Sequence, residues 1–277
     1  MSVYGQIKDK FIMRYAREDW AVYRSQLTDI ILEKSPKSVM IVGAGRCNDI
    51  DLEKIAGMTE KVICVDVDEE AMQAAISAIP EEFRGRVECR NVSLTGISEA
   101  DLESFCDKLL TAARAEGRSL TEDSFRTLLM SELNALKDKM VRSEEELMGK
   151  LPEKSVDTVV CCGVHSQLFS TVSFFIRSMI CSLQEIIPEV GELERVVDIT
   201  LHDMNNRVIP IIDNVLWRTA EKTVIFGNEY NPDNPVEGAE QCITYVGDHM
   251  NPEERHLRWE FNRAEGIIYD MLIQICE

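Results

Sequence analysis

One segment of this chain restricts its fold more than any other, an apolar run that ends in two closely spaced glycines. The run is Val39–Val42, and the glycines are Gly43 and Gly45. A second apolar run, Val62–Val65, follows and ends on Asp66. Continuous apolar runs are typical of strands buried on both faces of a parallel sheet. The segment therefore predicts a strand, a tight turn, a helix and a second strand.

The same turn has the features of a ligand site. Glycine lets a backbone approach a ligand where any Cβ would collide, and the start of the following helix presents free N–H groups. Asp66 lies 23 residues beyond Gly43, where a carboxylate can accept both hydroxyls of a ribose. The turn could also be a strand-to-helix connection without a ligand, and Asp66 could cap the next helix. The combination favours a site for an adenosine-containing cofactor.

The rest of the chain alternates apolar runs with helical patterns, which predicts an α/β, doubly wound, Rossmann-like sheet of about seven strands. The expected strands are Val39–Val42, Val62–Val65, Val87–Leu94, Val156–Cys162, Thr223–Phe226, His256–Phe261 and Ile267–Ile275. The last two are separated only by Asn262–Gly266, and a short turn cannot join parallel neighbours. We therefore expect a C-terminal antiparallel hairpin.

The helical patterns divide the chain. Residues 1–36 are expected to form an N-terminal helical cap, and residues 37–277 a Rossmann-like domain with a helical insertion at about 97–150. This insertion is too long for one crossover helix, and Ser98 with Asp101 resembles a capping box at its start. It could cover a substrate, form a dimer contact or be a solvated elaboration. A longer helix is expected over 193–220, with a kink or break at Pro210.

Composition predicts a cytoplasmic protein rather than a membrane or secreted protein. No apolar run approaches the ~20 residues that span a bilayer, and the first residues lack the layout of a signal peptide. The nine cysteines are scattered and include no CxxC pair, which indicates reduced thiols and gives no metal signature. We expect no metal.

The net charge of −19 bears on the partners. A phosphate backbone would be repelled, and the sequence holds no run of Lys or Arg to offset this. Nucleic acid and membranes are therefore disfavoured as partners, and a small-molecule substrate is favoured. If the chain self-associates, we expect a homodimer.

These residues resemble the class I S-adenosylmethionine-dependent methyltransferases, without identifying a specific member. That family has a seven-stranded sheet with a terminal antiparallel hairpin and a G-x-G-x-G turn. Gly43 and Gly45 match its first two glycines, whereas Cys47 occupies the third position. Asn48 occupies the third glycine of the nicotinamide-type pattern, so the glycines alone do not decide between the families. The predicted hairpin and the single-domain layout favour the methyltransferases.

The resemblance implies S-adenosylmethionine as cofactor and S-adenosylhomocysteine as product. It implies that Asp66 binds the ribose, Val67 packs on the adenine, and Cys162 with Gly163 lies beside the sulfonium. The residues expected to contact the cofactor are Gly43, Ala44, Gly45, Asn48, Asp49, Asp66, Val67, Ser93, Leu94, Cys162 and Gly163.

Two positions depart from the family pattern. Ile41 stands where the family commonly has an acidic residue that contacts the methionine amine. Asp49 is the nearest replacement, although a carboxylate there could instead stabilise the helix dipole without a ligand. Ser93 stands where the family usually places an Asp near the adenine amino group.

Two residues at strand ends are the expected catalytic side chains. In open α/β sheets the carboxyl ends of the strands line the ligand crevice. His165 follows the fourth strand there and could deprotonate a nucleophile, or it could belong to the start of the next helix. Tyr230 follows the fifth strand and could orient the substrate or only cover the pocket.

Methyl transfer to a small-molecule acceptor is therefore the expected function. Positioning and exclusion of water would supply most of the catalysis. Two alternatives stay open. One is an NAD-type oxidoreductase that uses the same glycine turn. The other is a non-catalytic S-adenosylmethionine-binding protein, because Ile41, Cys47 and Ser93 depart from the family pattern.

Overall fold

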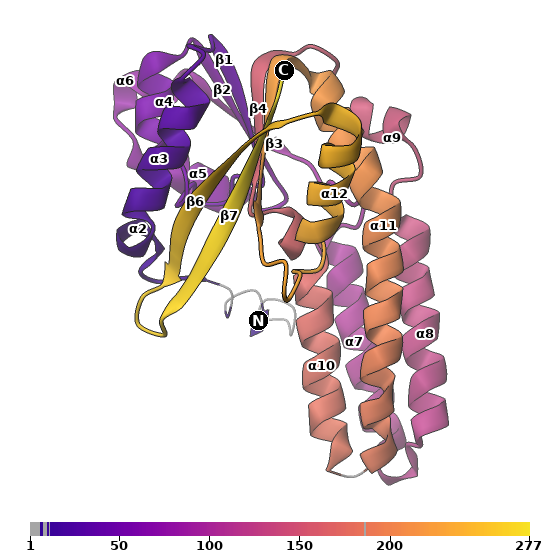
Figure 1. The fold of residues 1–277 in the computed structure, drawn as a ribbon. Helices are drawn as coiled ribbons and strands as arrows, with labels where there is room; N and C mark the ends of the chain where they lie inside the picture. Colours follow the sequence, from indigo (N-terminus) through magenta and orange to yellow (C-terminus); the bar gives the residue numbers. More distant parts are fainter. Residues whose placement is uncertain (1–5, 8–9, 11, 186) are drawn as a thin grey trace. The chain divides into compact units, whose positions relative to one another are not determined.

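The computed structural model describes residues 6–7, 10, 12–185 and 187–277 (Figure 1). These residues form two compact units. One unit contains residues 13–93, 143–166 and 209–277 and holds the sheet, and we call it the sheet unit. The other contains residues 94–142 and 167–208 with the first residues of the chain, and we call it the helical unit. Part of the predicted N-terminal helix, including Phe11, lies outside the described residues.

The sheet has seven strands in the order β3-β2-β1-β4-β5-β7-β6. Strands β3, β2, β1, β4 and β5 are parallel, whereas β7 pairs antiparallel with both β5 and β6. The strands are β1 Ser38–Val42, β2 Lys61–Asp66, β3 Val87–Asn91, β4 Val156–Cys162, β5 Ala220–Glu229, β6 Glu253–Asn262 and β7 Ile267–Cys276. The predicted doubly wound sheet with its terminal antiparallel hairpin is confirmed.

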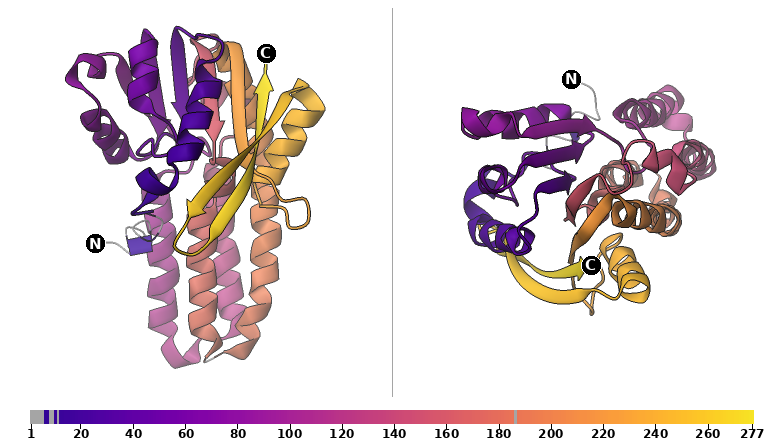
Figure 2. Two further views of the ribbon diagram at one scale, coloured as in Figure 1. Left: turned by 60° about the vertical axis from the view of Figure 1, so that its left-hand side comes forward. Right: turned by 90° about the horizontal axis from the view of Figure 1, so that it is seen from above.

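Helices cover both faces of this sheet (Figure 2). One face packs on α3 (Ala21–Leu32), α4 (Leu52–Met58) and α5 (Glu69–Ala78), and we call it the α3 face. Its core is a continuous cluster of buried side chains that includes Tyr23, Leu27, Ile41, Val160, Cys162 and Ile225. Because side chains alternate along a strand, Cys161 and Phe226 point to the other face. Helix α12 (Ala239–Met250) packs there on β5 and β7, and we call it the α12 face.

Side-chain caps set the starts of the helices that follow β1 and β2. The carboxylate of Asp51 accepts a hydrogen bond from the N–H of Lys54 at 3.0 Å, and that of Asp68 accepts one from Ala71 at 2.9 Å. Each cap satisfies an N–H group that has no partner within its helix. The remaining helices of the sheet unit are α2 Ala16–Asp19, α6 Glu81–Arg84 and α9 Glu144–Met148.

Residues 97–142 of the predicted insertion belong to the helical unit, whereas residues 143–150 belong to the sheet unit. The insertion contains α7 (Glu99–Glu116) and α8 (Glu122–Lys139), which lie beside α10 (Ser170–Gln184) and the first part of α11 (Leu193–Thr219). The predicted capping box forms, since Ser98 Oγ accepts from the N–H of Asp101 and the Asp101 carboxylate accepts from the N–H of Ser98. Buried apolar stripes hold these helices together, and Phe105 meets Phe175 edge-on at 6.1 Å.

Three expectations about element ends are corrected. Helix α11 continues through Pro210 without a break, and Ile209 and Ile212 on either side of the proline are fully buried. Strand β3 ends at Asn91 instead of residue 94. Strand β5 extends to Glu229 because its antiparallel pairing with β7 continues as far as Glu229 and Met271. No helix among the described residues has the length and apolar character needed to cross a bilayer.

Candidate functional site

The glycine turn after β1 is shaped by left-handed backbone conformations. Gly43 has φ +69° and Gly45 has φ +45°, which favour glycine because side chains collide there. The N–H of Gly43 donates to the carbonyl of Val65 at 2.8 Å, so the turn is tied to β2. A Cβ on Gly43 would overlap Val164 Cγ2. Both glycines are therefore required by the turn itself, and they remain at least partly exposed.

Cys47 occupies the third glycine position of the methyltransferase pattern and adopts a glycine-like conformation. Its φ is +51°, and its side chain is 7% exposed in the core of the α3 face. A left-handed conformation costs a non-glycine residue about 1–3 kcal/mol. The chain keeps the backbone shape of the G-x-G-x-G turn and uses the extra side chain for packing.

The Asp66 carboxylate connects the glycine turn to the end of β2 through hydrogen bonds. Its Oδ2 accepts from the N–H of Gly45 at 2.8 Å, and its Oδ1 accepts from the N–H of Asp68 at 2.9 Å. Burial raises the pKa of this carboxyl, and the two backbone hydrogen bonds oppose that shift. Each carboxylate oxygen has a further lone pair, so Asp66 holds the loop and keeps capacity for another donor.

The residues predicted on the adenine side lie at the ends of β2 and β3. Val67 is 38% exposed, and Ser93 is half-buried. Asn91, which the sequence analysis did not single out, donates from Nδ2 to the carbonyl of Val67 at 2.9 Å. Leu94 is buried and belongs to the helical unit.

Asp49 lies beside Tyr23 and Cys162 on the α3 face. Its charge contributes to raising the pKa values of both of these groups, after the larger effect of burial. Burial raises the pKa of Asp49 itself to about 6, and the Arg24 guanidinium opposes this shift. A carboxylate therefore lies near the end of β4.

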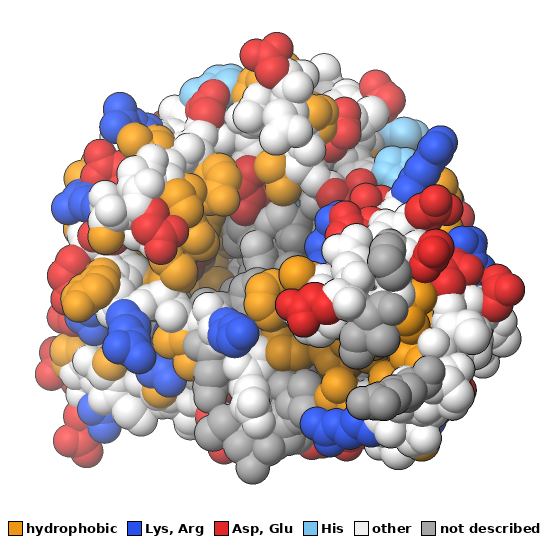
Figure 3. All heavy atoms as spheres, turned by 90° about the horizontal axis from the view of Figure 1, so that it is seen from below, with side chains coloured by type: hydrophobic (Ala, Val, Ile, Leu, Met, Phe, Trp, Pro, Cys, Tyr) orange, Lys and Arg blue, Asp and Glu red, His pale blue; other side chains and the backbone are white. Residues whose placement is uncertain are grey.

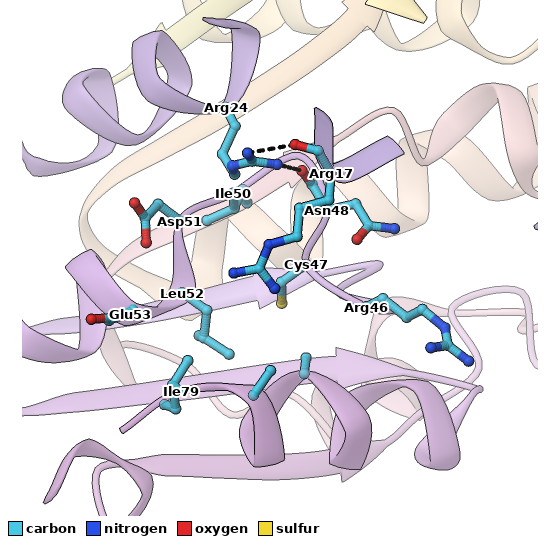
Figure 4. A pocket seen from close by; sticks show the side chains of 12 residues that line it. Arg17, Arg24, Arg46, Cys47, Asn48, Ile50, Asp51, Leu52, Glu53 and Ile79 are labelled. Carbon is cyan, nitrogen blue, oxygen red and sulfur yellow. Dashed lines mark hydrogen bonds between the residues drawn. The ribbon is translucent and has the colours of Figure 1, made fainter. Parts of the chain in front are cut away.

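A separate cavity of about 200 Å³ lies between the loop after β1 and helix α5 (Figure 4). Arg24 connects two segments of its wall. Its Nη1 donates to the carbonyl of Asn48 and its Nη2 donates to the carbonyl of Arg17, both at 2.7 Å. The Arg46 side chain extends away from this pair. Among the predicted cofactor residues, Asn48 lies in the described wall of this cavity. Arg46 and Cys47 of the glycine turn also line this cavity, whereas Gly43, Gly45 and Asp66 are not in its wall.

Aromatic side chains surround the end of β4 on the α3 face. Tyr23 stacks on Trp259 with ring centroids 5.0 Å apart, and Trp20 meets Trp259 edge-on at 4.8 Å. The Trp259 indole also packs over Gly163, 3.7 Å from where a Cβ of that residue would lie. Cys162 is buried beneath this cluster. The two residues predicted beside the sulfonium are therefore covered by aromatic rings.

His165 is enclosed on the α12 face. It is 1% exposed, with Nδ1 3.1 Å from Asn228 Oδ1 and Nε2 2.8 Å from Asp213 Oδ1. Asn228 Nδ2 donates to Cys242 Sγ at 3.3 Å. Asp213 Oδ2 has no nitrogen or oxygen partner among the described residues, but a hydrogen bond to Asp213 contributes to the raised pKa of the Cys242 thiol. Both ring nitrogens of His165 are thus occupied by protein groups.

The end of β5 places two neighbouring residues differently. Glu229 is 6% exposed, and its Oε1 accepts from Ser166 Oγ at 2.9 Å. Tyr230 is 36% exposed, and its ring meets that of His256 edge-on at 5.5 Å. The buried side chain at this strand end is therefore Glu229, one residue before the predicted Tyr230.

Sequence reasoning missed several residues of this edge, namely Tyr23, Asp213, Glu229 and Trp259. The ring contact between Tyr23 and Trp259 joins segments more than 200 residues apart. One signal was available for Glu229, since it is an acidic residue that closely follows the apolar run Thr223–Phe226, with Gly227 and Asn228 between them. Asp213 had no comparable signal because it lies within a long helix.

Charged side chains of both signs are exposed on one face of the molecule. Figure 3 shows Asp and Glu side chains, together with Lys and Arg, on the face seen from below.

Comparison with known proteins gives structural likenesses only. No protein-family model matches the chain, and no curated protein matches it. One similar solved structure is the N-methyltransferase NodS from Bradyrhizobium japonicum WM9 with S-adenosyl-L-homocysteine, at 12% identity and TM-score 0.47, covering 100% of this chain and 98% of that one. Another is a SAM-dependent methyltransferase from Aquifex aeolicus, at 12% identity and TM-score 0.43, covering 99% and 98%.

A third is magnesium protoporphyrin IX methyltransferase from Synechocystis PCC 6803 with bound SAM, at 10% identity and TM-score 0.44, covering 99% of this chain and 89% of that one. At these TM-scores the likenesses identify neither a substrate nor a site in this chain.

Proposed function

We propose that this protein binds S-adenosylmethionine and transfers its methyl group to a small-molecule acceptor. The observation that carries the proposal is the pair of backbone hydrogen bonds to Asp66. These bonds hold its carboxylate against an exposed glycine turn at the carboxyl edge of the sheet. A sheet of seven strands with an antiparallel terminal hairpin supports the methyltransferase reading over the NAD-type alternative.

The residues of this edge fit the chemical groups of the cofactor. Asp66 offers free lone pairs to ribose hydroxyls, and exposed Val67 offers an apolar surface to the adenine. Asp49, half-buried beside Cys162, offers a carboxylate to the methionine ammonium. Aromatic faces near Gly163 suit a sulfonium cation. When bound, the cofactor supplies an electrophilic methyl group.

The chain's own residues then act mainly by position. The Gly43–Gly45 turn and Asp66 set one end of the site, and the aromatic cluster around Trp259 excludes water from the end of β4. Holding reactants in line and away from water supplies a large part of the barrier reduction in such reactions. Ala44, Asn48, Ser93 and Leu94 stay predicted contacts.

We assign His165 a positioning role. Its ring nitrogens bond Asp213 and Asn228, and a Cβ on Gly238 at the start of α12 would overlap the His165 carbonyl. This arrangement fixes the backbone between β4 and the following Ser166, whose hydroxyl bonds Glu229. Tyr230 stays a predicted substrate-side residue.

The remaining partner predictions rest on charge and cysteine chemistry. The net charge of −19 favours a small molecule over nucleic acid. All nine cysteines are free thiols, which supports a cytoplasmic location. A homodimer stays a prediction.

Calorimetric titration of the purified chain with S-adenosylmethionine, S-adenosylhomocysteine and NADH tests the proposal. We expect saturable binding of the first two and none of NADH. Glu70→Gln, an exposed carboxylate on α5, serves as a control that leaves these affinities unchanged. Binding of NADH alone would establish the oxidoreductase alternative, and the absence of all three isotherms would refute a cofactor site.

A further inference from the structure

Two polar atoms at the carboxyl edge of the sheet are buried without a partner. They are Glu229 Oε2 on β5 and Trp259 Nε1 on β6, and neither has a hydrogen bond among the described residues. Each of these side chains is 6% exposed. A buried polar atom without a partner destabilises the folded state, and more so when it is charged. Native structures keep such atoms for a reason, and completion by a ligand is one.

The Glu229 carboxylate is held in a fixed orientation. Ser166 Oγ donates to Oε1 at 2.9 Å, so one oxygen is anchored to the segment after β4 and the other is left free. No lysine or arginine within the described chain forms an ion pair with Glu229. Its charge instead contributes to raising the pKa values of Tyr23, Cys162 and Tyr269, after the larger effect of burial on each. The carboxylate thus has no cationic partner among the described residues, and the Asp49 carboxylate acts on the same Tyr23 and Cys162 groups.

The groups around Glu229 are those that recognise ammonium ions. Tyr23 and Trp259 stack at 5.0 Å, and Tyr269 lies 6.1 Å from Trp259. Aromatic faces attract cations, most strongly where water is excluded. The charge of Glu229 also acts on Cys162, which lies at the end of β4 where the sulfonium is expected. A cation held by Glu229 would therefore lie near the transferred methyl group.

We infer that the methyl acceptor is an amine, bound as its ammonium ion by Glu229 Oε2 and enclosed by the rings of Tyr23, Trp259 and Tyr269. The inference rests on the proposed methyl transfer and names its substrate class. An alcohol or thiol acceptor would bring no positive charge to Glu229. A phosphate or carboxylate next to it would be repelled.

The transfer step then uses Glu229 as a base. The ammonium ion gives one proton to Glu229 Oε2 and becomes a neutral amine. The nitrogen lone pair forms the new N–C bond to the methyl carbon, the C–S bond breaks, and its electron pair returns to sulfur. The products are an N-methylammonium ion and S-adenosylhomocysteine, and the proton on Glu229 passes to solvent when they leave.

Binding of a matched pair of probes tests the inference. The probes are 2-phenylethylamine, an ammonium ion at pH 7.5, and 2-phenylethanol, its neutral analogue. Quenching of tryptophan fluorescence reports binding, since Trp20 and Trp259 lie in the cluster. We expect the full chain, free and loaded with S-adenosylhomocysteine, to prefer the amine by about tenfold or more. Equal affinities for the two probes in the wild type would overturn the inference.

The variant Glu229→Gln keeps the shape and the Ser166 contact but removes the charge. We expect it to bind S-adenosylhomocysteine as the wild type does and to lose the amine preference. The control Glu265→Gln changes an exposed carboxylate in the β6–β7 turn and should keep the preference. If Glu229→Gln weakens S-adenosylmethionine but keeps the amine preference, Glu229 serves the sulfonium and the inference is wrong. If the wild type does not bind S-adenosylhomocysteine at all, that result counts against the proposed function. The ratio of the two probe affinities in the free chain still tests the amine preference by itself.

Discussion

His165 and Glu229 lie at the ends of neighbouring strands, and both are almost fully buried, but their partners differ. On the α12 face, both ring nitrogens of His165 bond side chains of the protein, and Asn228 links that pair to Cys242. On the α3 face, Glu229 has one bonded oxygen and one without a partner, and the indole N–H of Trp259 is also unpaired. Both ring nitrogens of His165 are thus bonded within the protein, although Asp213 Oδ2 beside them has no nitrogen or oxygen partner among the described residues, whereas Glu229 keeps one of its own oxygens unbonded.

The difference indicates which buried polar groups serve the fold and which serve a ligand. A satisfied network stabilises one arrangement of the chain and has nothing left to offer a substrate. An unsatisfied carboxylate lowers stability in the free protein, and a ligand that supplies the missing donor recovers that free energy. His165 looked the better catalytic candidate in the sequence, but Glu229 is the residue with free bonding capacity.

The largest expected effect is on the His165 network of the α12 face. Asp213→Ala leaves the fully buried His165 without its 2.8 Å partner. Removing one member of a buried pair typically costs about 3–5 kcal/mol. We therefore expect the free energy of unfolding, measured by urea denaturation, to fall by about that amount.

Asp248→Ala removes an exposed carboxylate from α12 on the same face and should change stability by less than about 0.5 kcal/mol. An Asp213→Ala protein as stable as this control would show that the His165 network does not hold the fold together.

The hydrogen bonding of Asp66 is intermediate between that of His165 and that of Glu229, since both of its carboxylate oxygens have backbone partners but keep free lone pairs. Asp66→Asn turns an amide N–H group toward a backbone N–H group and removes the charge. We expect the affinity for S-adenosylhomocysteine to fall about tenfold to hundredfold, the value of one charge-assisted hydrogen bond. Calorimetry measures this. An unchanged affinity in a folded variant would remove Asp66 from the site.

Asp49 adds a pH dependence to the α3 face. Its pKa is raised by burial from 3.8 to about 6, so the folded state binds an extra proton between these values. Stability should therefore fall as pH rises through that window and level off above it. The affinity for S-adenosylhomocysteine should change in the opposite direction, rising by up to about tenfold per pH unit below pH 6 as the carboxylate ionises and can pair with an ammonium.

Titrations between pH 5 and pH 8 measure this dependence, and Asp49→Asn should flatten the affinity profile. If the wild-type affinity were constant over this range, the carboxylate would not contact the ligand.

The smallest expected effect has the opposite sign to that of Asp213→Ala. Glu229→Gln removes a buried charge that has no cation, so the free protein should become more stable, by about 1 kcal/mol. Urea denaturation of the two variants side by side gives the most direct test of the comparison. A loss of stability in Glu229→Gln as large as in Asp213→Ala would show that the two faces do not differ.

Much of the fold followed from local patterns. The apolar runs at Val39–Val42 and Val156–Cys162 predicted central strands because burial on both sides of a sheet requires such runs. The short turn at Asn262–Gly266 predicted the antiparallel hairpin because nothing longer was available for a crossover. Expectations about element ends were weaker, since the extent of β5 depends on its pairing with β7 and the continuity of α11 through Pro210 depends on packing.

For the site, the sequence by itself determined the glycine turn and Asp66, because both depend on neighbours close along the chain. Gly43 and Gly45 do take the left-handed conformations that their residue type allows. Only the tertiary structure decided that His165 is enclosed and Glu229 is not satisfied, because their partners come from segments 48 and 63 residues away. Hydrogen-bond satisfaction is a property of the packed neighbourhood, and a residue's type and strand position do not specify it.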